Sequence, residues 1–157
     1  MNFKKWKPYI FFVLLSEGVG LLSWLFTRES MAVYSGSIQK PPLSPPAIVF
    51  PIVWTILYAL MGISAAMVAT SHNRKEGDNS LNLFVAQLVV NFFWSLFFFN
   101  AQAFGFASLW LVLLWVLVLL MILSFSKVDR VAAWLQIPYL IWLTFAAYLS
   151  FGVYLLN

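Results

Sequence analysis

Tryptophans within long apolar stretches are the residues of this sequence with the clearest chemical potential. Trp54 lies about a third of the way into one stretch, and Trp94, Trp115 and Trp142 lie near the middle of three others. An indole N–H inside a bilayer has no water to bind, so it needs an acceptor from the protein or from a ligand. Several indoles at similar depth indicate an aromatic-lined cavity, and close helix packing is the alternative.

Polar residues in the same stretches add two candidate contacts. Asn91 and Ser95 are four residues apart and share one helix face, which Trp94 flanks. A buried amide must be paired, so this face points into the bundle and serves as an interhelical hydrogen bond, a ligand contact or both. Glu17 is the ionisable residue deep in a stretch. Such a residue marks a functional site by default, but we favour a protonated acid hydrogen-bonded to a neighbouring helix.

The composition places these residues in a membrane protein. Of 157 residues, 63% are hydrophobic and 9% are charged, whereas a soluble domain is about a quarter charged. The chain is too apolar for a disordered segment or a coiled coil, and a net charge of +4 is too small for a nucleic-acid partner. With no cysteine, the chain has no disulfide, no thiolate-ligated cluster and no covalent haem attachment.

Five apolar stretches are long enough to cross a bilayer, which takes roughly 20 residues per helix. They are apolar on all sides, unlike the alternating strands of a membrane barrel. The sequence therefore predicts an all-α integral membrane protein, one domain over 1–157 with five transmembrane helices. The predicted spans are 8–26, 47–70, 81–100, 105–125 and 131–155.

The breaks between the spans differ in length. The long first break, Thr27–Pro46, contains four prolines, which stiffen it and favour a lid over a cavity; a rigid connector is the alternative. The polar run Ser71–Ser80 is predicted as a second break. In the fifth span, Pro138 is predicted to kink the helix near Tyr139 and Trp142.

Cations near the helix ends predict the orientation. Seven belong to one face and two, Arg28 and Lys40, belong to the other. This excess predicts a cytoplasmic N-terminus and an outside C-terminus. The seven are Lys4, Lys5, Lys7, Arg74, Lys75, Lys127 and Arg130.

Several ordered motifs resemble the translocator protein (tryptophan-rich sensory protein) family. They run in family order from Tyr34 to the end of the chain, and together they are specific. The motifs are Tyr34-Ser-Gly, Gln39-Lys40-Pro41, Pro45-Pro46, Val53-Trp54-Thr55-Ile56-Leu57-Tyr58, Gln87-Leu88 with Asn91 and Trp94, and Pro138-Tyr139-Leu140-Ile141-Trp142-Leu143-Thr144-Phe145-Ala146.

This resemblance implies a five-helix bundle in a bacterial cell membrane, commonly a homodimer, with a cavity closed by the first loop. Family members bind protoporphyrin IX, haem and other flat hydrophobic molecules, which implies a sensing or regulatory role. Light-dependent porphyrin degradation, with Trp54 and Trp142 as catalytic residues, and porphyrin transport are the alternatives. The implied ligand-binding residues are Tyr34, Pro45, Trp54, Tyr58, Asn91, Trp94, Ser95, Phe98, Trp142, Ala146 and Leu149.

The sequence departs from the family at three points. Leu43 stands where many members have Trp, one extra residue separates Tyr34 from Lys40, and Phe151 and Leu155 replace the animal sterol motif. These departures affect the lid and argue against that sterol motif.

Residue chemistry adds a constraint on the ligand. The only histidine is His72, in a predicted cytoplasmic loop, so haem iron would lack its usual axial ligands. We expect no metal site and no required cofactor, and we expect metal-free porphyrin to suit the pocket at least as well as haem. The ring would stack on Trp54 and Trp142, with its propionates near Arg28 or Lys40.

Overall fold

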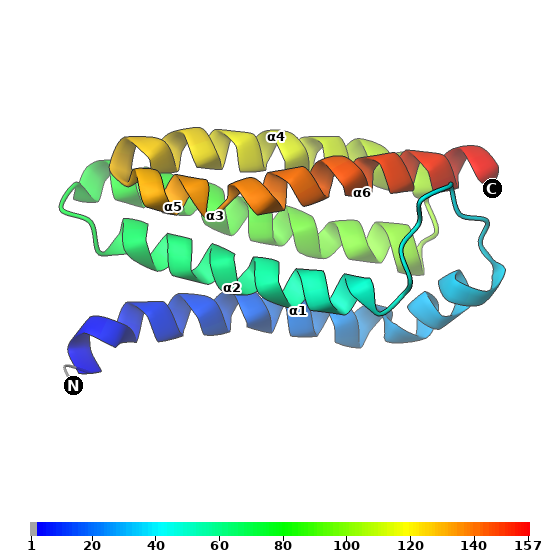
Figure 1. The fold of residues 1–157 in the computed structure, drawn as a ribbon, viewed down its shortest axis with the longest axis horizontal. Coiled ribbons are helices and arrows are strands. Elements are labelled where there is room, and N and C mark those ends of the chain that lie inside the picture. The colour runs from blue at the N-terminus through cyan, green and yellow to red at the C-terminus, as the bar shows by residue number, and fades with distance from the viewer. Residues whose placement is uncertain (1–2) are drawn as a thin grey trace.

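The computed structural model describes residues 3–157 as long helices that run back and forth along one axis (Figure 1). Five helical segments are long and apolar enough to cross a membrane, with α3 joined to η1 and α5 to α6, which confirms the predicted all-helical fold. The elements are α1 (Phe3–Ser37), α2 (Val49–Ala69), α3 (Arg74–Ser95), the π-helical turn η1 (Leu96–Asn100), α4 (Phe104–Val128), α5 (Arg130–Trp134) and α6 (Ile137–Leu156).

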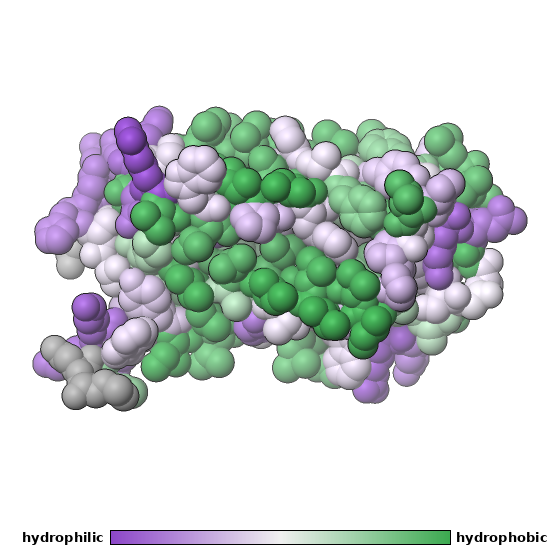
Figure 2. Space-filling view, viewed as in Figure 1, coloured by the Kyte–Doolittle hydropathy of each residue, from purple (hydrophilic) through white to green (hydrophobic). Residues whose placement is uncertain are grey.

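The surface of the bundle is apolar along its length and polar at both ends. Figure 2 shows hydrophobic side chains (green) over the middle and hydrophilic ones (purple) gathered at the two ends. Leu14, Leu109 and Ile141 are 67%, 66% and 64% exposed. Lipid tails solvate such a surface, whereas water does not. The chain is therefore an integral membrane protein.

Helix α1 is longer than predicted. We expected it to end at Phe26, but it continues to Ser37, so the first loop covers only residues 38–48. Tyr34 explains the extension, because its ring packs against Phe98 and Phe99 with centroids 5.5 and 5.3 Å apart. This contact stabilises helical backbone up to the start of the loop, and after Pro8 the next proline in the chain is Pro41.

The predicted break over 71–80 is also shorter. Helix α3 begins at Arg74, and Ser80 is buried within it. The Ser80 and Ser124 hydroxyl oxygens lie 2.7 Å apart in a hydrogen bond that joins α3 to α4. Contact with α4 therefore stabilises a helical segment that looks like a loop by composition.

The fifth span is divided rather than kinked at Pro138. Helix α5 ends at Trp134 and α6 begins at Ile137, which places Pro138 in the first turn of α6. Proline is tolerated there because the first N–H groups of a helix have no intrahelical partner. The helix is therefore interrupted earlier, at residues 135–136, and α6 is continuous through Tyr139 and Trp142, where we predicted the kink.

Small residues let α1 and α2 touch. A Cβ atom on Gly62 would lie 2.4 Å from the Val13 Cα atom, and one on Gly20 would lie 2.6 Å from the Tyr58 ring. Between these contacts, the Ser16 hydroxyl donates a 2.8 Å hydrogen bond to the Tyr58 carbonyl oxygen. The two helices are therefore closely packed from Val13 to Gly20.

Candidate ligand-binding cavity

A cavity of about 650 Å³ lies inside the end of the bundle that carries the 38–48 loop. Side chains from α1, the loop, α2, α3, η1 and α6 surround it. The fold gathers all eleven predicted ligand-binding residues around this one space, and ligand binding by them stays a prediction. They are Tyr34, Pro45, Trp54, Tyr58, Asn91, Trp94, Ser95, Phe98, Trp142, Ala146 and Leu149.

Aromatic rings form much of the cavity wall. On α2, Trp54 and Tyr58 are one turn apart, with ring centroids separated by 5.5 Å. Trp94 of α3 stacks on Phe98 of η1 with centroids 5.2 Å apart and an interplanar angle of 26°. Trp142 adds an indole from α6. Flat apolar rings on several helices favour a planar hydrophobic guest.

Two hydrogen bonds hold the polar part of the wall together. The Asn91 amide nitrogen donates to the Tyr58 hydroxyl at 2.9 Å, and the Ser23 hydroxyl donates to the Ser95 hydroxyl at 2.8 Å. These bonds connect α3 to α2 and to α1. Asn91 and Ser95 therefore join helices and line the cavity at once.

Two cavity tryptophans have an indole N–H without an acceptor. Among residues 3–157, the Nε1 atoms of Trp94 and Trp142 are buried and make no hydrogen bond. Trp115 lies outside the cavity, and its Nε1 donates to the Thr144 hydroxyl at 2.9 Å. Helix packing therefore satisfies the indole N–H of Trp115 but leaves those of Trp94 and Trp142 without an acceptor.

Cations line the lid end of the cavity. The Arg28 guanidinium lies 5.9 Å from the centroid of the Trp24 ring, and the Lys40 ammonium lies 5.0 Å from that of Tyr34. Neither forms an ion pair with a described side chain. Both positive charges can therefore attract an anionic group of a ligand.

Glu17 of α1 also lines the cavity. We expected its carboxyl to bond to a neighbouring helix, but in the described part of the chain it makes no hydrogen bond or ion pair. The expected hydrogen bond is therefore not formed, and the adjacent Ser16 hydroxyl bonds instead to the Tyr58 carbonyl oxygen.

The 38–48 loop, which we call the lid, is fastened to α6. The Asn157 amide donates to the Gln39 carbonyl oxygen at 2.8 Å and accepts from the Gln39 N–H at 3.0 Å. The Tyr148 hydroxyl donates to the Pro42 carbonyl oxygen at 2.7 Å. Four residues of the lid line the cavity: Lys40, Ser44, Pro45 and Ala47. The loop therefore covers the cavity, whereas Leu43 is 82% exposed and takes no part in the lining.

Comparison with known proteins agrees with this architecture. The model of the TspO/MBR family matches residues 12–156. The chain belongs to the TspO/MBR family. It is 38% identical over 144 residues to the tryptophan-rich protein TspO of Chlorobaculum tepidum, with 91% of each chain covered. It is 32% identical to the translocator protein of Bos taurus over 95% of this chain and 89% of the other. It is 31% identical to TspO of Bacillus cereus over the whole of both chains.

Sequence reasoning missed most of the α1 contribution to this TspO/MBR cavity. Trp24 fits an interfacial belt by its position near a predicted helix end, yet it lines the cavity. The available signal is a stripe of small and hydroxyl side chains at helical spacing, which marks a helix face that approaches its neighbours. The stripe is Ser16, Gly20, Ser23 and Thr27.

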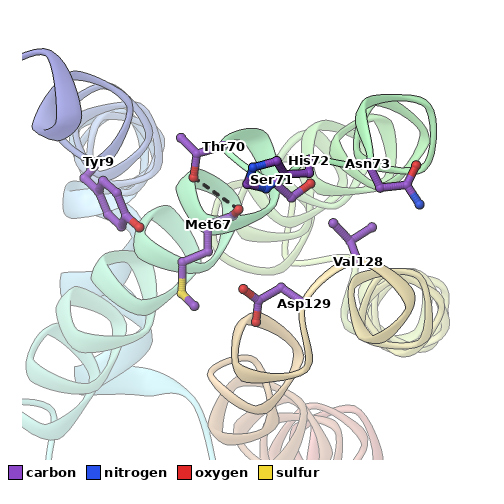
Figure 3. A pocket seen from close by; sticks show the side chains of 8 residues that line it. All are labelled: Tyr9, Met67, Thr70, Ser71, His72, Asn73, Val128 and Asp129. Atoms are coloured by element: carbon purple, nitrogen blue, oxygen red, sulfur yellow. Dashed lines mark hydrogen bonds between the residues drawn. The ribbon is translucent and has the colours of Figure 1, made fainter.

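His72 lies at the opposite end of the bundle from the cavity. It lines a second hollow of about 450 Å³ there, together with Ser71, Asp129 and Tyr9 (Figure 3). No group of three or more metal-ligating His, Asp or Glu side chains occurs in the described residues. The cavity lining contains no histidine, so of the usual haem ligands it offers tyrosine and methionine.

Proposed function

We propose that this TspO/MBR protein binds tetrapyrroles and similar flat hydrophobic molecules in the lidded cavity, in a sensing or regulatory role. The observation that carries the proposal is that Trp54, Trp94 and Trp142, from three helices, line one cavity of about 650 Å³. That volume lies within the usual range for small-molecule sites, about 300–1,000 Å³. The family resemblance supplies the ligand class.

The cavity lining suits a ligand with an apolar body and an acidic edge. Trp54 and Trp142 offer surfaces for stacking, and Arg28 and Lys40 offer cations at the lid end for propionate groups. Because no histidine lines the cavity, protoporphyrin IX is expected to bind at least as well as haem.

Quenching of tryptophan fluorescence by protoporphyrin IX tests this function. Trp54→Phe and Trp142→Phe should each raise the Kd about three- to tenfold, since an aromatic contact is worth about 0.5–1.5 kcal/mol. Trp134→Phe is the matched control, because Trp134 is 71% exposed and lies outside the cavity. Equal affinities for all three variants would exclude the cavity as the porphyrin site.

Light-dependent porphyrin degradation is the second candidate function, favoured by two oxidisable indoles in one cavity wall. Irradiation of the complex in air should then yield a new absorbing product. The indole mechanism is wrong if Trp54→Phe and Trp142→Phe leave product formation intact. Uptake of porphyrin into sealed vesicles would instead indicate transport.

We also propose that the cation-rich end of the bundle faces the cytoplasm, with the lid and the C-terminus outside. Labelling of single cysteines at Ser71 and Asn157 by a membrane-impermeant reagent in intact cells tests this, since the natural chain has no cysteine. The family resemblance further implies a homodimer, which light scattering of the purified protein can test.

A further inference from the structure

The cavity has an open side between α1 and α2. The α2 face that contacts α1 through Gly62 continues, at intervals of seven and four residues, to Thr55 and Pro51. Both residues line the cavity and both are exposed, so α1 does not cover them. The helices touch at one end of this face and leave a gap at the other.

The facing side of α1 is open in the same region. Leu21 and Trp24 line the cavity and are 57% and 49% exposed. One helical turn before Trp24 in the chain, the contact between Gly20 and the Tyr58 ring closes the gap. We call this gap the slit, bounded by Leu21, Trp24 and Arg28 on α1 and by Pro51 and Thr55 on α2.

The charges of α1 set the depth of the slit in the membrane. Lys7 and Arg28 are 21 residues apart, or about 31 Å along a helix, which matches the roughly 30 Å hydrocarbon core. Arg28 therefore lies at the headgroup level of the leaflet on the lid side. From Gly20 to Arg28 the slit runs about 12 Å, most of the depth of that leaflet.

We propose that an anionic phospholipid of the lid-side leaflet occupies the slit, with one acyl chain between α1 and α2 and its phosphate bound by Arg28. An apolar gap at this depth adjoins lipid tails, so the acyl chain of a neighbouring lipid can fill it. Arg28 and Lys40 have no carboxylate partner among the described side chains, and Glu29 lies about 100° further round the helix. The two cations favour an anionic headgroup over a zwitterionic one.

This proposal does not rest on tetrapyrrole binding, and its test contains no porphyrin. Protein reconstituted in equal amounts of phosphatidylglycerol and phosphatidylcholine is released into the gas phase, and the retained lipid is identified by native mass spectrometry. The wild type should retain one lipid, with phosphatidylglycerol favoured about fivefold per cation engaged. Arg28→Gln should remove most of that preference, whereas Arg130→Gln, at the opposite end of the bundle, should keep it.

Two variants that fill the slit from opposite walls test the acyl-chain site. Leu21→Trp and Thr55→Trp should each lose the retained lipid, whereas Leu109→Trp, which adds an indole to the exposed face of α4, should retain it. Circular dichroism of each variant checks its helix content. Equal lipid retention by the folded slit variants and Leu109→Trp overturns the proposal. So does a wild type without headgroup preference.

Discussion

The side-chain amide of Asn91 donates a 2.9 Å hydrogen bond to the hydroxyl of Tyr58, and both residues are buried in the cavity wall. This bond ties α3 to α2 at a depth where water is absent. The same two side chains therefore shape the cavity and hold its walls in register.

Tyr58→Phe should destabilise the bundle because it removes the only acceptor that the Asn91 amide has among the described residues. The expected loss is about 0.5–2 kcal/mol, the range measured for interhelical hydrogen bonds in membranes. Thermal unfolding in detergent measures the loss, with Tyr154→Phe, 53% exposed, as the control. Equal melting temperatures for the two variants would contradict the structural role of this bond.

Two glycines of the α1–α2 pair should respond in opposite ways to alanine. A Cβ on Gly62 meets the Val13 backbone, so Gly62→Ala should force the helices apart and cost about 1–3 kcal/mol. A Cβ on Gly18 meets nothing within 4 Å, so Gly18→Ala should stabilise α1 by about 0.5–1 kcal/mol. Unfolding curves of both variants check the signs, and a stable Gly62→Ala protein would show that this contact is looser than described.

Asn157→Ala should loosen the lid because it removes both hydrogen bonds to Gln39. If the lid retains a porphyrin in the cavity, the dissociation rate should rise about threefold to tenfold, as for a loss of about 1 kcal/mol. Stopped-flow fluorescence measures this rate. Asn79→Ala, at an exposed site near the start of α3, is the control and should release porphyrin at the wild-type rate.

His72→Ala should leave the absorption spectrum of added ferric haem unchanged, because His72 lines the hollow at the other end of the bundle. Haem and metal-free protoporphyrin IX should then bind within about threefold of each other, since no strong axial ligand favours the iron form. A Soret band that shifts with this substitution would place histidine on the iron and refute our account of the site.

Several features follow from the sequence because local composition decides them. A bilayer core of about 30 Å requires an apolar stretch of fixed length, so the five spans can be counted without any tertiary contact. The ends of the helices, in contrast, depend on tertiary contacts. Helix α1 runs to Ser37 because Tyr34 packs on Phe98 and Phe99, and those partners lie more than sixty residues away in the chain.

The site shows the same division. Family motifs identify Trp54, Asn91 and Trp142, but Trp24 and Glu17 enter the cavity only through the way α1 lies against α2. Whether the Glu17 carboxyl finds a partner also depends on which groups of other helices lie near it. Such pairing is a property of assembled helices, so residue spacing does not reveal it.

By itself, the sequence determined that this protein resides in a membrane, how often it crosses and which aromatic residues are candidates for a ligand. Hydropathy and helix rise act locally, so one chain segment at a time settles those points. Only the tertiary structure decided that residues from Glu17 to Ser150 surround one space, that the lid is tied to α6 and that the space opens between α1 and α2. Those features arise from close contacts between distant segments, where a single glycine or tyrosine sets how near two helices can come.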